Sequence, residues 1–299
     1  MGSKNNNNDV FKLENLFSVK GKVALITGGG SGIGLMATQA LAVNGAKVYI
    51  VGRTADKLER VVETYSQDIP GQIIPITADV SSKSDISKLV DQISSKENHL
   101  DILINNAGIE LNSQQTEAKS AEEFKKNVFD DEKETFELWT DTYRTNVAQI
   151  FFMTTAFLPL LAKATEHQHG WSGTVINISS ISGIVKTAQH HFAYNASKAA
   201  AIHLTQMLSS EISSNGIKVR INSIAPGVFP SEMTAQESGA DQKSSIPKEK
   251  YEDKTSARRP GKDEDMGNAI LFVATNQYLQ AQTVTVDGGY VIEAGAGPA

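Results

Sequence analysis

The alternation of short apolar segments with amphipathic segments constrains the fold of this chain more than any other feature. Residues 23–27 form a continuous apolar run of the kind found in buried parallel strands. Apolar residues then recur at helical spacing from Ile33 to Leu41, until Asn44 and Gly45 interrupt the pattern. The same succession predicts further strands at 48–51, 73–77, 100–104, 174–178, 219–224 and 283–286, and further helices at 58–65, 86–93, 134–161, 194–214 and 263–274.

Strict alternation of this kind predicts an α/β fold, in which one doubly wound parallel sheet of about seven strands carries helices on both faces. Ligands of such sheets bind outside the carboxyl ends of the strands. Pro75 lies within the strand predicted at 73–77. Because proline lacks the N–H that a central strand must donate, this strand is expected at an edge of the sheet.

Two stretches interrupt the alternation, and both ends of the chain fall outside it. Residues 111–131 and 229–256 are polar and lack an apolar period. Segments of such length inside a compact domain are usually functional or disordered. We interpret the first as a surface insertion and the second as a possible substrate lid, because it directly follows a predicted strand. The expected domain is a single one that runs from 21 to 292, between flexible tails at 1–20 and 293–299.

A glycine-rich turn, Thr-Gly-Gly-Gly-Ser-Gly-Ile-Gly at 27–34, lies between the first strand and the first helix. Without side chains, glycines let the backbone approach a diphosphate closely, and the N-terminus of the following helix favours its negative charge. The spacing differs from the G-x-G-x-x-G pattern, because Ile33 stands at its third glycine position. The residues expected to contact a dinucleotide in this turn are Gly28, Gly30, Ser31, Gly32, Ile33 and Gly34.

Tyr194 and Lys198 lie four residues apart on a predicted helix and therefore share one face of it. The pKa of a free phenol is about 10, which makes tyrosine a poor proton donor or acceptor at neutral pH. A nearby ammonium group favours the phenolate and lowers that pKa. The pair is therefore a candidate for general acid–base chemistry, although Tyr and Lys at this spacing often form only a solvated helix face.

Four sequence blocks together resemble the short-chain dehydrogenase/reductase family. They are the glycine turn, Asn-Asn-Ala-Gly at 105–108, Ser-Ser at 179–180 and Tyr-Asn-Ala-Ser-Lys at 194–198, and the resemblance extends over 21–292. The resemblance implies a single-domain Rossmann fold and an NADP(H)- or NAD(H)-dependent oxidoreductase. It also implies a catalytic tetrad, which in this sequence consists of Asn146, Ser180, Tyr194 and Lys198.

Each member of the implied tetrad has a role in the chemistry of the family. Tyr194 would protonate a carbonyl oxygen during reduction and accept the proton during alcohol oxidation. Lys198 would lower the phenol pKa and bind the nicotinamide ribose, and Ser180 would hold the substrate oxygen. Asn146 would support a water molecule that relays protons to Lys198. Ser179 is the alternative to Ser180, and we prefer Ser180 because the family usually uses the second serine.

The residue that follows the second strand favours NADP(H) over NAD(H). Dinucleotide folds that prefer NAD place an acidic residue there to bind the ribose hydroxyls. Gly52 and Arg53 stand at this place, and a guanidinium group suits the additional 2′-phosphate of NADP. By resemblance, Asp79 and Val80 would contact the adenine, Asn106, Ala107 and Gly108 would support the ribose and the central strand end, and Pro226, Gly227 and Val228 would contact the nicotinamide amide.

The charge and composition argue against several other classes of function. The net charge is −6 and the chain has no cysteine, so we expect no nucleic-acid or anionic membrane partner, no disulfide and no thiolate metal site. His190 and His191 could line a substrate pocket just before Tyr194, but the histidines and carboxylates lack metal-ligand spacing. No signal segment or transmembrane helix is apparent, and a cytoplasmic location is expected.

Of the properties considered, the substrate and the oligomeric state are those that the sequence constrains least. Residues 226–234 are similar to a run in fungal and bacterial 3-oxoacyl and rhamnolipid-type reductases, and Phe229 and Met233 would offer an apolar lining to a ketone of modest size. An NADP(H)-dependent carbonyl reductase or alcohol dehydrogenase is the leading interpretation. The alternatives are a sugar-alcohol or hydroxysteroid dehydrogenase and a non-catalytic NADP-binding sensor. Alanines at 199–201 allow close helix packing, and relatives in this family commonly form tetramers, so we expect a homotetramer, with a dimer second.

Overall fold

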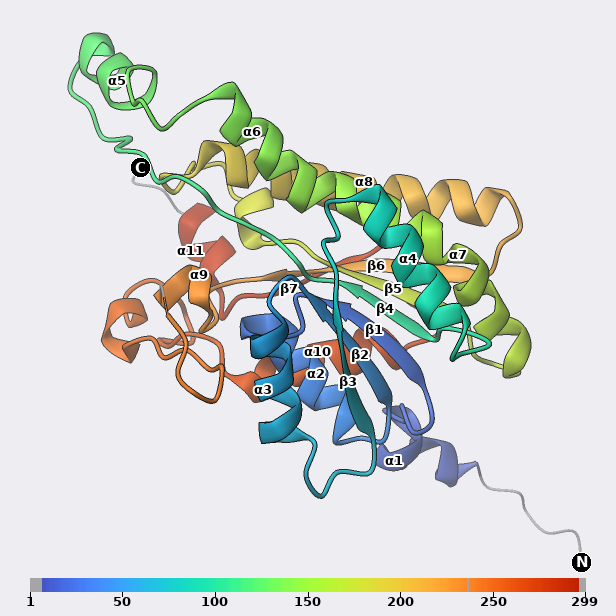
Figure 1. Cartoon of the computed structure of the whole chain (residues 1–299). Coiled ribbons are helices and arrows are strands. Elements are labelled where there is room, and N and C mark those ends of the chain that lie inside the picture. The colour runs from blue at the N-terminus through green and yellow to red at the C-terminus, as the bar shows by residue number, and fades with distance from the viewer. Residues whose placement is uncertain (1–6, 236, 296–299) are drawn as a thin grey trace, which may run out of the picture.

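A computed structural model describes residues 7–235 and 237–295. Within them, seven strands form one all-parallel sheet in the order β3-β2-β1-β4-β5-β6-β7 (Figure 1). The strand order reverses between β1 and β4, which is the switch point where ligands bind in such sheets. The predicted single-domain, doubly wound parallel sheet is therefore confirmed. The strands are β1 (Val23–Thr27), β2 (Lys47–Gly52), β3 (Gln72–Thr77), β4 (Ile102–Asn105), β5 (Gly173–Ile178), β6 (Val219–Pro226) and β7 (Thr283–Val286).

Helices cover both faces of the sheet and bury one apolar core on each (Figure 1). Side chains of β1 alternate between the two cores, since Ala24 and Ile26 face one and Val23 and Leu25 face the other. The first core is closed by α2 (Gly32–Ala42), α3 (Ala55–Tyr65) and α10 (Asp263–Thr275), and the second by α4 (Lys83–Ser94), α7 (Gln149–His167) and α8 (Phe192–Ser214). The shorter elements are η1 (Asn8–Phe11), α1 (Leu13–Leu16), α5 (Ala121–Val128), α6 (Phe136–Tyr143), η2 (Arg144–Ala148), η3 (Ile181–Gly183), α9 (Glu232–Ala235), η4 (Lys248–Tyr251) and α11 (Tyr290–Gly295).

The strand that contains a proline lies at one edge of the sheet, as the sequence predicts. Pro75 of β3 stands opposite Ile50 of β2, and β2 is the only neighbour of β3 in the described sheet. The missing N–H of Pro75 therefore interrupts no ladder on its outer side.

One long helix, predicted at 134–161, is continuous but irregular. It begins as α6, passes through η2, which is a turn of π-helix, and continues as α7 to His167. By length and composition alone, the stretch Phe136–His167 could cross a membrane. Its side chains Ile150, Met153 and Phe157 are fully buried in the core of this domain, which accounts for its apolar character.

The segment at 111–131 contains a helix that the sequence did not predict. This helix, α5, projects from one end of the molecule (Figure 1) and has no buried side chain. The Ser120 hydroxyl caps it by accepting a hydrogen bond of 3.1 Å from the Glu123 N–H.

The expected tails are only partly described. In the N-terminal one, η1 and α1 form between residues 8 and 16 and Val19 is fully buried, so the packed part of the chain begins before residue 21. Residues 293–295 belong to α11. The remainder of both tails, 1–6 and 296–299, lies outside the described residues.

Candidate active site

The glycine turn between β1 and α2 is closed so tightly that several of its glycines are needed for conformation or space. Gly32 has a φ of +51°, in the left-handed region that glycine adopts at little cost. A Cβ on Gly34 would overlap the carbonyl oxygen of Gly28. The buried Thr38 hydroxyl donates to the Gly34 carbonyl at 2.8 Å, a contact that sequence reasoning did not identify because Thr38 reads only as a helix residue. At Gly28, Gly30 and Gly32 the turn therefore presents backbone, without side chains, to the cavity that these residues line.

Asn106 and Thr27 join this turn to the end of β4. The Asn106 amide Nδ2 donates to the carbonyl oxygens of Thr27 at 3.0 Å and Gly28 at 3.1 Å. The Thr27 hydroxyl in turn accepts from the backbone N–H groups of Asn106 and Ala107, at 2.9 and 3.0 Å. Two strands that are adjacent in the sheet thus hold one another's terminal loops at the switch point.

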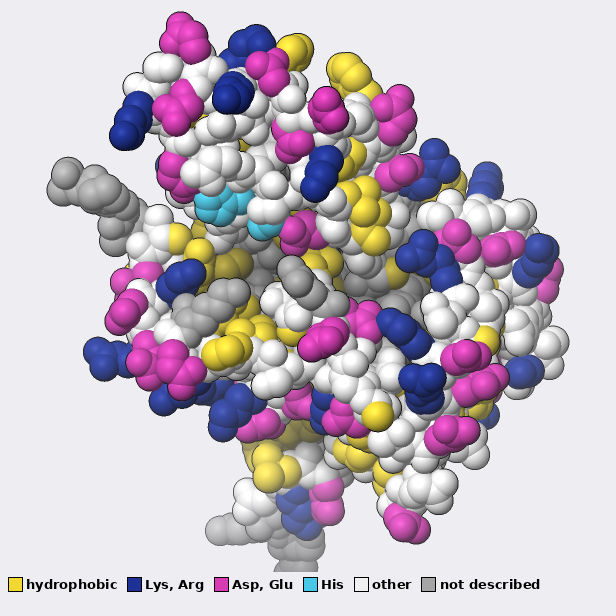
Figure 2. Space-filling view, turned by 60° about the vertical axis from the view of Figure 1, so that its left-hand side comes forward, with side chains coloured by type: hydrophobic (Ala, Val, Ile, Leu, Met, Phe, Trp, Pro, Cys, Tyr) yellow, Lys and Arg dark blue, Asp and Glu magenta, His cyan; other side chains and the backbone are white. Residues whose placement is uncertain are grey.

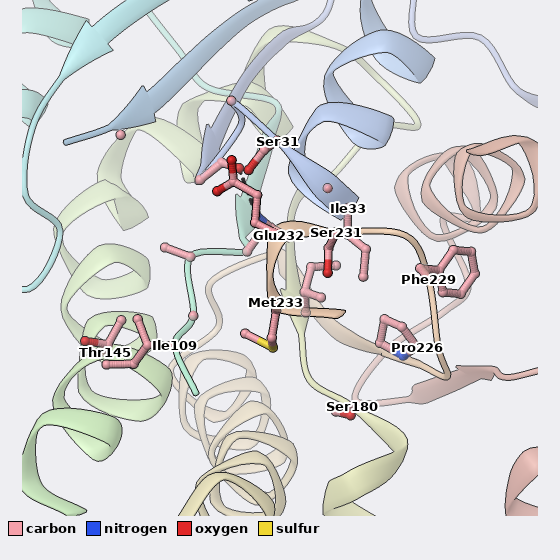
Figure 3. A pocket seen from close by; sticks show the side chains of 18 of the residues that line it. Ser31, Ile33, Ile109, Thr145, Ser180, Pro226, Phe229, Ser231, Glu232 and Met233 are labelled. Carbon is pink, nitrogen blue, oxygen red and sulfur yellow. Dashed lines mark hydrogen bonds between the residues drawn. The ribbon is translucent and has the colours of Figure 1, made fainter. Parts of the chain in front are cut away.

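A cavity of about 390 Å³ opens over the carboxyl ends of the strands, and Figure 3 shows part of its lining. It brings together most residues that the sequence singles out for the cofactor and for catalysis. These are Gly28, Gly30, Ser31, Gly32, Ile33, Arg53, Asp79, Asn106, Ala107, Gly108, Ser180, Tyr194, Lys198, Pro226 and Gly227.

Four predicted site residues do not line this cavity. Gly34 lies under the turn, and Val80 packs against the core that α4 and α7 cover. Val228 lines a separate cavity beside Arg259. Asn146 is buried behind the site and reaches it only through its neighbours.

Lys198 and Tyr194 approach one another from the same face of α8. The Lys198 Nζ lies 5.5 Å from the centre of the Tyr194 ring and donates a 3.0 Å hydrogen bond to the Ile178 carbonyl at the end of β5. Burial lowers the pKa of Lys198 to about 8. At neutral pH the ammonium form therefore still predominates.

The pKa of the Tyr194 phenol is raised, whereas its lysine neighbour was expected to lower it. Burial raises the pKa of Tyr194 to about 12, a hydrogen bond with Ser180 opposes this rise, and the charge of Glu110 adds to it. Desolvation penalises the phenolate more than the nearby groups stabilise it. In this geometry Tyr194 is a protonated phenol at neutral pH.

The two adjacent serines have different surroundings. Ser179 is buried, and its hydroxyl contacts Ser223 Oγ at 2.7 Å and donates to the Ile224 carbonyl at 2.9 Å. The Ser180 hydroxyl accepts from the Ser182 N–H at 3.1 Å and hydrogen-bonds with Tyr194. Ser180 is thus the serine whose hydroxyl faces the phenol, while the hydroxyl of Ser179 is bonded between β5 and β6.

Asn146 lies in the π turn η2, a type of helical irregularity that is frequent at functional sites. Its Oδ1 accepts from the Ile109 N–H at 2.8 Å, and its Nδ2 donates to the Ile109 carbonyl at 2.9 Å and to Ser197 Oγ at 3.0 Å. Asn146 therefore links the loop after β4 to the helix that carries Lys198.

The cavity also contains a charged pair that sequence reasoning missed. Lys57 Nζ lies 2.7 Å from Glu232 Oε1, and both residues line the cavity. Hydrogen bonds from Ser81, and then the charge of Arg53, hold the pKa of Asp79 below its usual value. Lys57 comes four residues after Arg53 and could have been found by its nearness in sequence, whereas Glu232 comes from a distant segment without a periodic pattern.

The histidines before Tyr194 contact Glu110 and the first residues of the segment at 111–131. His191 Nδ1 lies 2.9 Å from Glu110 Oε1, and its hydrogen bond with this carboxylate raises the pKa of His191. His190 Nδ1 lies 2.9 Å from the Gln114 carbonyl oxygen.

Over the described ranges, no group of three or more His, Cys, Asp or Glu side chains could hold a metal ion. Figure 2 shows basic and acidic side chains interspersed over the face that it presents.

Known proteins resemble this chain in sequence and in fold. A family model described as short chain dehydrogenase matches residues 22–242. The short-chain dehydrogenase/reductase PhomF of Diaporthe leptostromiformis is 36% identical over 92% of each chain. The rhamnolipids biosynthesis 3-oxoacyl-[acyl-carrier-protein] reductase of Pseudomonas aeruginosa is 31% identical over 92% of this chain and 98% of its own. The Pseudomonas aeruginosa RhlG/NADP active-site complex superposes with a TM-score of 0.75 at 30% identity, over 92% of this chain and 98% of that one. The chain therefore belongs to the short-chain dehydrogenase/reductase family of oxidoreductases.

Proposed function

We propose that this protein is an NADP(H)-dependent oxidoreductase that transfers hydride between nicotinamide and a ketone or secondary alcohol, with Tyr194 as the general acid/base. One observation carries the proposal: Ser180, Tyr194 and Lys198 line the same cavity as the glycine turn. A dinucleotide-binding sensor, the alternative from another functional class, would need only the turn. An oxidoreductase needs both the turn and a proton-transfer group beside it.

The residues of the turn fit a nicotinamide dinucleotide. Glycine is required at positions 32 and 34 for backbone conformation and space, and the turn opens directly into the N-terminus of α2, which favours an anionic group. Arg53 lies at the end of β2, is exposed and lines the cavity. A guanidinium at this place supports the preference for NADP(H), because the 2′-phosphate would accept its paired hydrogen bonds.

When bound, the cofactor supplies hydride to the carbonyl carbon of a substrate. Tyr194 then donates its phenolic proton to the carbonyl oxygen, and Ser180 hydrogen-bonds to the same oxygen. Tyr194 is protonated at neutral pH, as reduction requires, and its raised pKa of about 12 makes it a weaker acid than a free phenol. Lys198 remains largely an ammonium group at neutral pH and can help to restore the phenolic proton. Positioned acid–base catalysis of this kind contributes about 10²–10⁴ in rate.

Asn146 and the loops around the cavity complete the proposed site. Asn146 orders the segment at Ile109 and the helix of Lys198, and the relay of protons through a water molecule remains our proposal for it. Phe229 and Met233 line the cavity from the segment at 229–256, which we propose as the substrate lid. Their apolar side chains favour a ketone of modest size, such as the 3-oxoacyl type named for one relative, over a sugar alcohol. A hydroxysteroid remains the alternative apolar substrate.

For the assembly we propose a homotetramer, with a dimer second. Phe151 on α7 and Met207 on α8 are 43% and 51% exposed, so each of the two long helices has an apolar side chain on its outer surface. Light scattering at micromolar protein would contradict this proposal if it gave the mass of a single chain.

The decisive experiment is a titration of the purified protein with NADPH and NADH, followed by turnover on a panel of ketones and 3-oxoacyl thioesters. Nicotinamide fluorescence reports binding, and nicotinamide absorbance reports turnover. We expect NADPH to bind more tightly and turnover to be lost in Tyr194→Phe while NADPH binding is retained. Tyr278→Phe, at a fully exposed tyrosine, is the matched control and should change neither. Failure to bind either nucleotide would overturn the proposed function.

A further inference from the structure

A carboxylate of the protein itself occupies the entrance to the glycine turn. Glu232, the first residue of α9, accepts hydrogen bonds from Lys57 Nζ at 2.7 Å and from Ser238 Oγ at 2.6 Å, and it also hydrogen-bonds with Ser31. Figure 3 shows the Glu232 carboxylate beside Ser31, which directly precedes α2. These bonds hold the pKa of Glu232 below its usual value, so an anionic carboxylate lies beside Ser31 at the start of α2.

The segment that carries Glu232 rests directly on the turn. A Cβ on Gly32 would lie 2.8 Å from the Cβ of Ser231, so only glycine allows this approach. The Ser231 N–H donates to the Thr234 hydroxyl at 2.9 Å, and that hydroxyl donates to the Phe229 carbonyl at 2.8 Å. The carboxylate is therefore held in place by a folded segment as well as by its charge.

The cations at this end of the cavity face carboxylates. Lys57 lies on the first turn of α3, four residues after Arg53, and both line the cavity. Lys57 is paired with Glu232, and the charge of Arg53 acts on Asp79. A dinucleotide brings several negative charges to the same place, and two anions cannot share one cation and one helix start without strong repulsion.

We propose that Glu232 is an internal anion that competes with the phosphate groups of the cofactor for Ser31 and Lys57. Lys57 is then a second phosphate-binding cation, beside Arg53, which becomes available once the segment of Glu232 moves aside. This inference rests on the proposed function, because it assumes that the cavity binds a dinucleotide. It adds to that function a pair of residues that sets cofactor affinity.

The test is the affinity of Glu232→Gln and Lys57→Gln for NADPH, measured by nicotinamide fluorescence at fixed ionic strength. Removing the competing charge should tighten binding about two- to fivefold, which corresponds to a partly exposed ion pair. Removing the cation should weaken binding about tenfold, as expected for a charged hydrogen bond. The matched controls are Glu237→Gln, at an exposed carboxylate of the same segment, and Arg60→Gln, at an exposed cation of α3; both should bind like the parent protein.

A double variant and two smaller ligands make the outcome specific. In Lys57→Gln, the further change Glu232→Gln should tighten binding less than it does in the parent protein, because the two residues share one interaction. Competition by ADP and by 2′,5′-ADP identifies the phosphate concerned: a stronger gain for ADP assigns the pair to the diphosphate, and a stronger gain for 2′,5′-ADP assigns it to the 2′-phosphate.

The failure of the inference differs from that of the proposed function. Unchanged or weaker NADPH binding in Glu232→Gln, with thermal unfolding like that of the parent, would overturn the competition. Unchanged binding in Lys57→Gln would overturn the role of the lysine. A parent protein that binds neither NADPH nor NADH would instead overturn the proposed function.

Discussion

Asn146 is hydrogen-bonded to both backbone groups of Ile109, through its Oδ1 at 2.8 Å and its Nδ2 at 2.9 Å. The same Nδ2 donates to Ser197, one residue before Lys198. A hypothetical Cβ on Gly108 would lie 3.3 Å from Asn146 Oδ1 and 3.4 Å from Lys198 Nζ, so the loop, the amide and the ammonium group are packed together. One buried amide thus sets the distance between the loop after β4 and the helix of the proposed catalytic residues.

The adjacent serines allow a paired prediction. Ser180→Ala removes the hydroxyl that bonds Tyr194 and should lower ketone turnover about tenfold or more, with little change in stability. Ser179→Ala removes a buried hydroxyl between β5 and β6 and should cost about 1–3 kcal/mol of unfolding free energy, with turnover retained. Turnover and urea unfolding of both variants check this prediction. Equal losses of turnover would show that the two serines do not divide their roles in this way.

Arg53→Ala tests the cofactor preference. A lost charged hydrogen bond costs roughly 1.5–3 kcal/mol, so NADPH should bind about tenfold or more weakly while NADH affinity changes little. The measurement is a titration with each nucleotide, and Arg60→Ala, at an exposed arginine of α3, is the control. Similar losses for NADPH and NADH would contradict a contact between Arg53 and the 2′-phosphate.

Gly34→Ala tests the closeness of the glycine turn. The added Cβ would overlap the Gly28 carbonyl oxygen, so the variant should lose about 3 kcal/mol or more of unfolding free energy, together with nucleotide binding. Gly267→Ala, within α10, is the control, because a Cβ on Gly267 would meet only the Cβ of Ala40 on α2, at 3.4 Å. That change should leave stability equal or raise it by about 1 kcal/mol. Thermal unfolding of a Gly34→Ala protein that matched the parent would contradict the structure of the turn.

The lowered pKa of Lys198 predicts a pH-dependent stability. The unfolded chain, with a pKa near 10.5, binds this proton more tightly than the folded chain, with a pKa of about 8. The buried charge therefore destabilises the fold by about 3 kcal/mol below pH 8, and this penalty disappears as the pH rises to about 10.5. The stability advantage of Lys198→Met over the parent protein should be largest at pH 7 and should be lost by pH 10.

Chemical unfolding at both pH values measures this effect. Lys198→Met also removes the hydrogen bond to the Ile178 carbonyl, which lowers stability at every pH. The diagnostic quantity is therefore how the stability difference between the variant and the parent changes from pH 7 to pH 10. Lys96→Met, at an exposed lysine, should show no such trend. A stability difference between Lys198→Met and the parent that stays constant from pH 7 to pH 10 would show that Lys198 titrates normally.

Local patterns predicted the sheet well, because apolar periodicity and turn chemistry act within a few residues. The continuous apolar run at 23–27 became β1, and Pro75 placed β3 at the sheet edge. The helix α5 was missed for a related reason: its apolar residues Ala121, Phe124 and Val128 recur at helical spacing over only eight residues, which is too short a stretch to stand out in a polar segment.

Properties that depend on tertiary contacts could not be predicted in the same way. The spacing of Tyr194 and Lys198 predicted their shared helix face, but the direction of the phenol pKa depends on burial, which other elements create. Likewise, Lys57 and Glu232 are 175 residues apart in the sequence, and no short-range pattern predicts their contact. The division between Ser179 and Ser180 also required the neighbouring strand β6 to be in place.

The π turn at Arg144–Ala148 has a consequence for insertions and deletions in this chain. A π turn accommodates one residue more than an α-helix does over the same rise. Deleting a single residue there would restore a regular helix and rotate everything on one side of the deletion by about 100° relative to the other. The helix could then direct Asn146 toward Ile109, or Ile150 and Met153 toward the core, but not both. The extra residue is therefore the structural compromise that lets one continuous helix satisfy two neighbours in different directions.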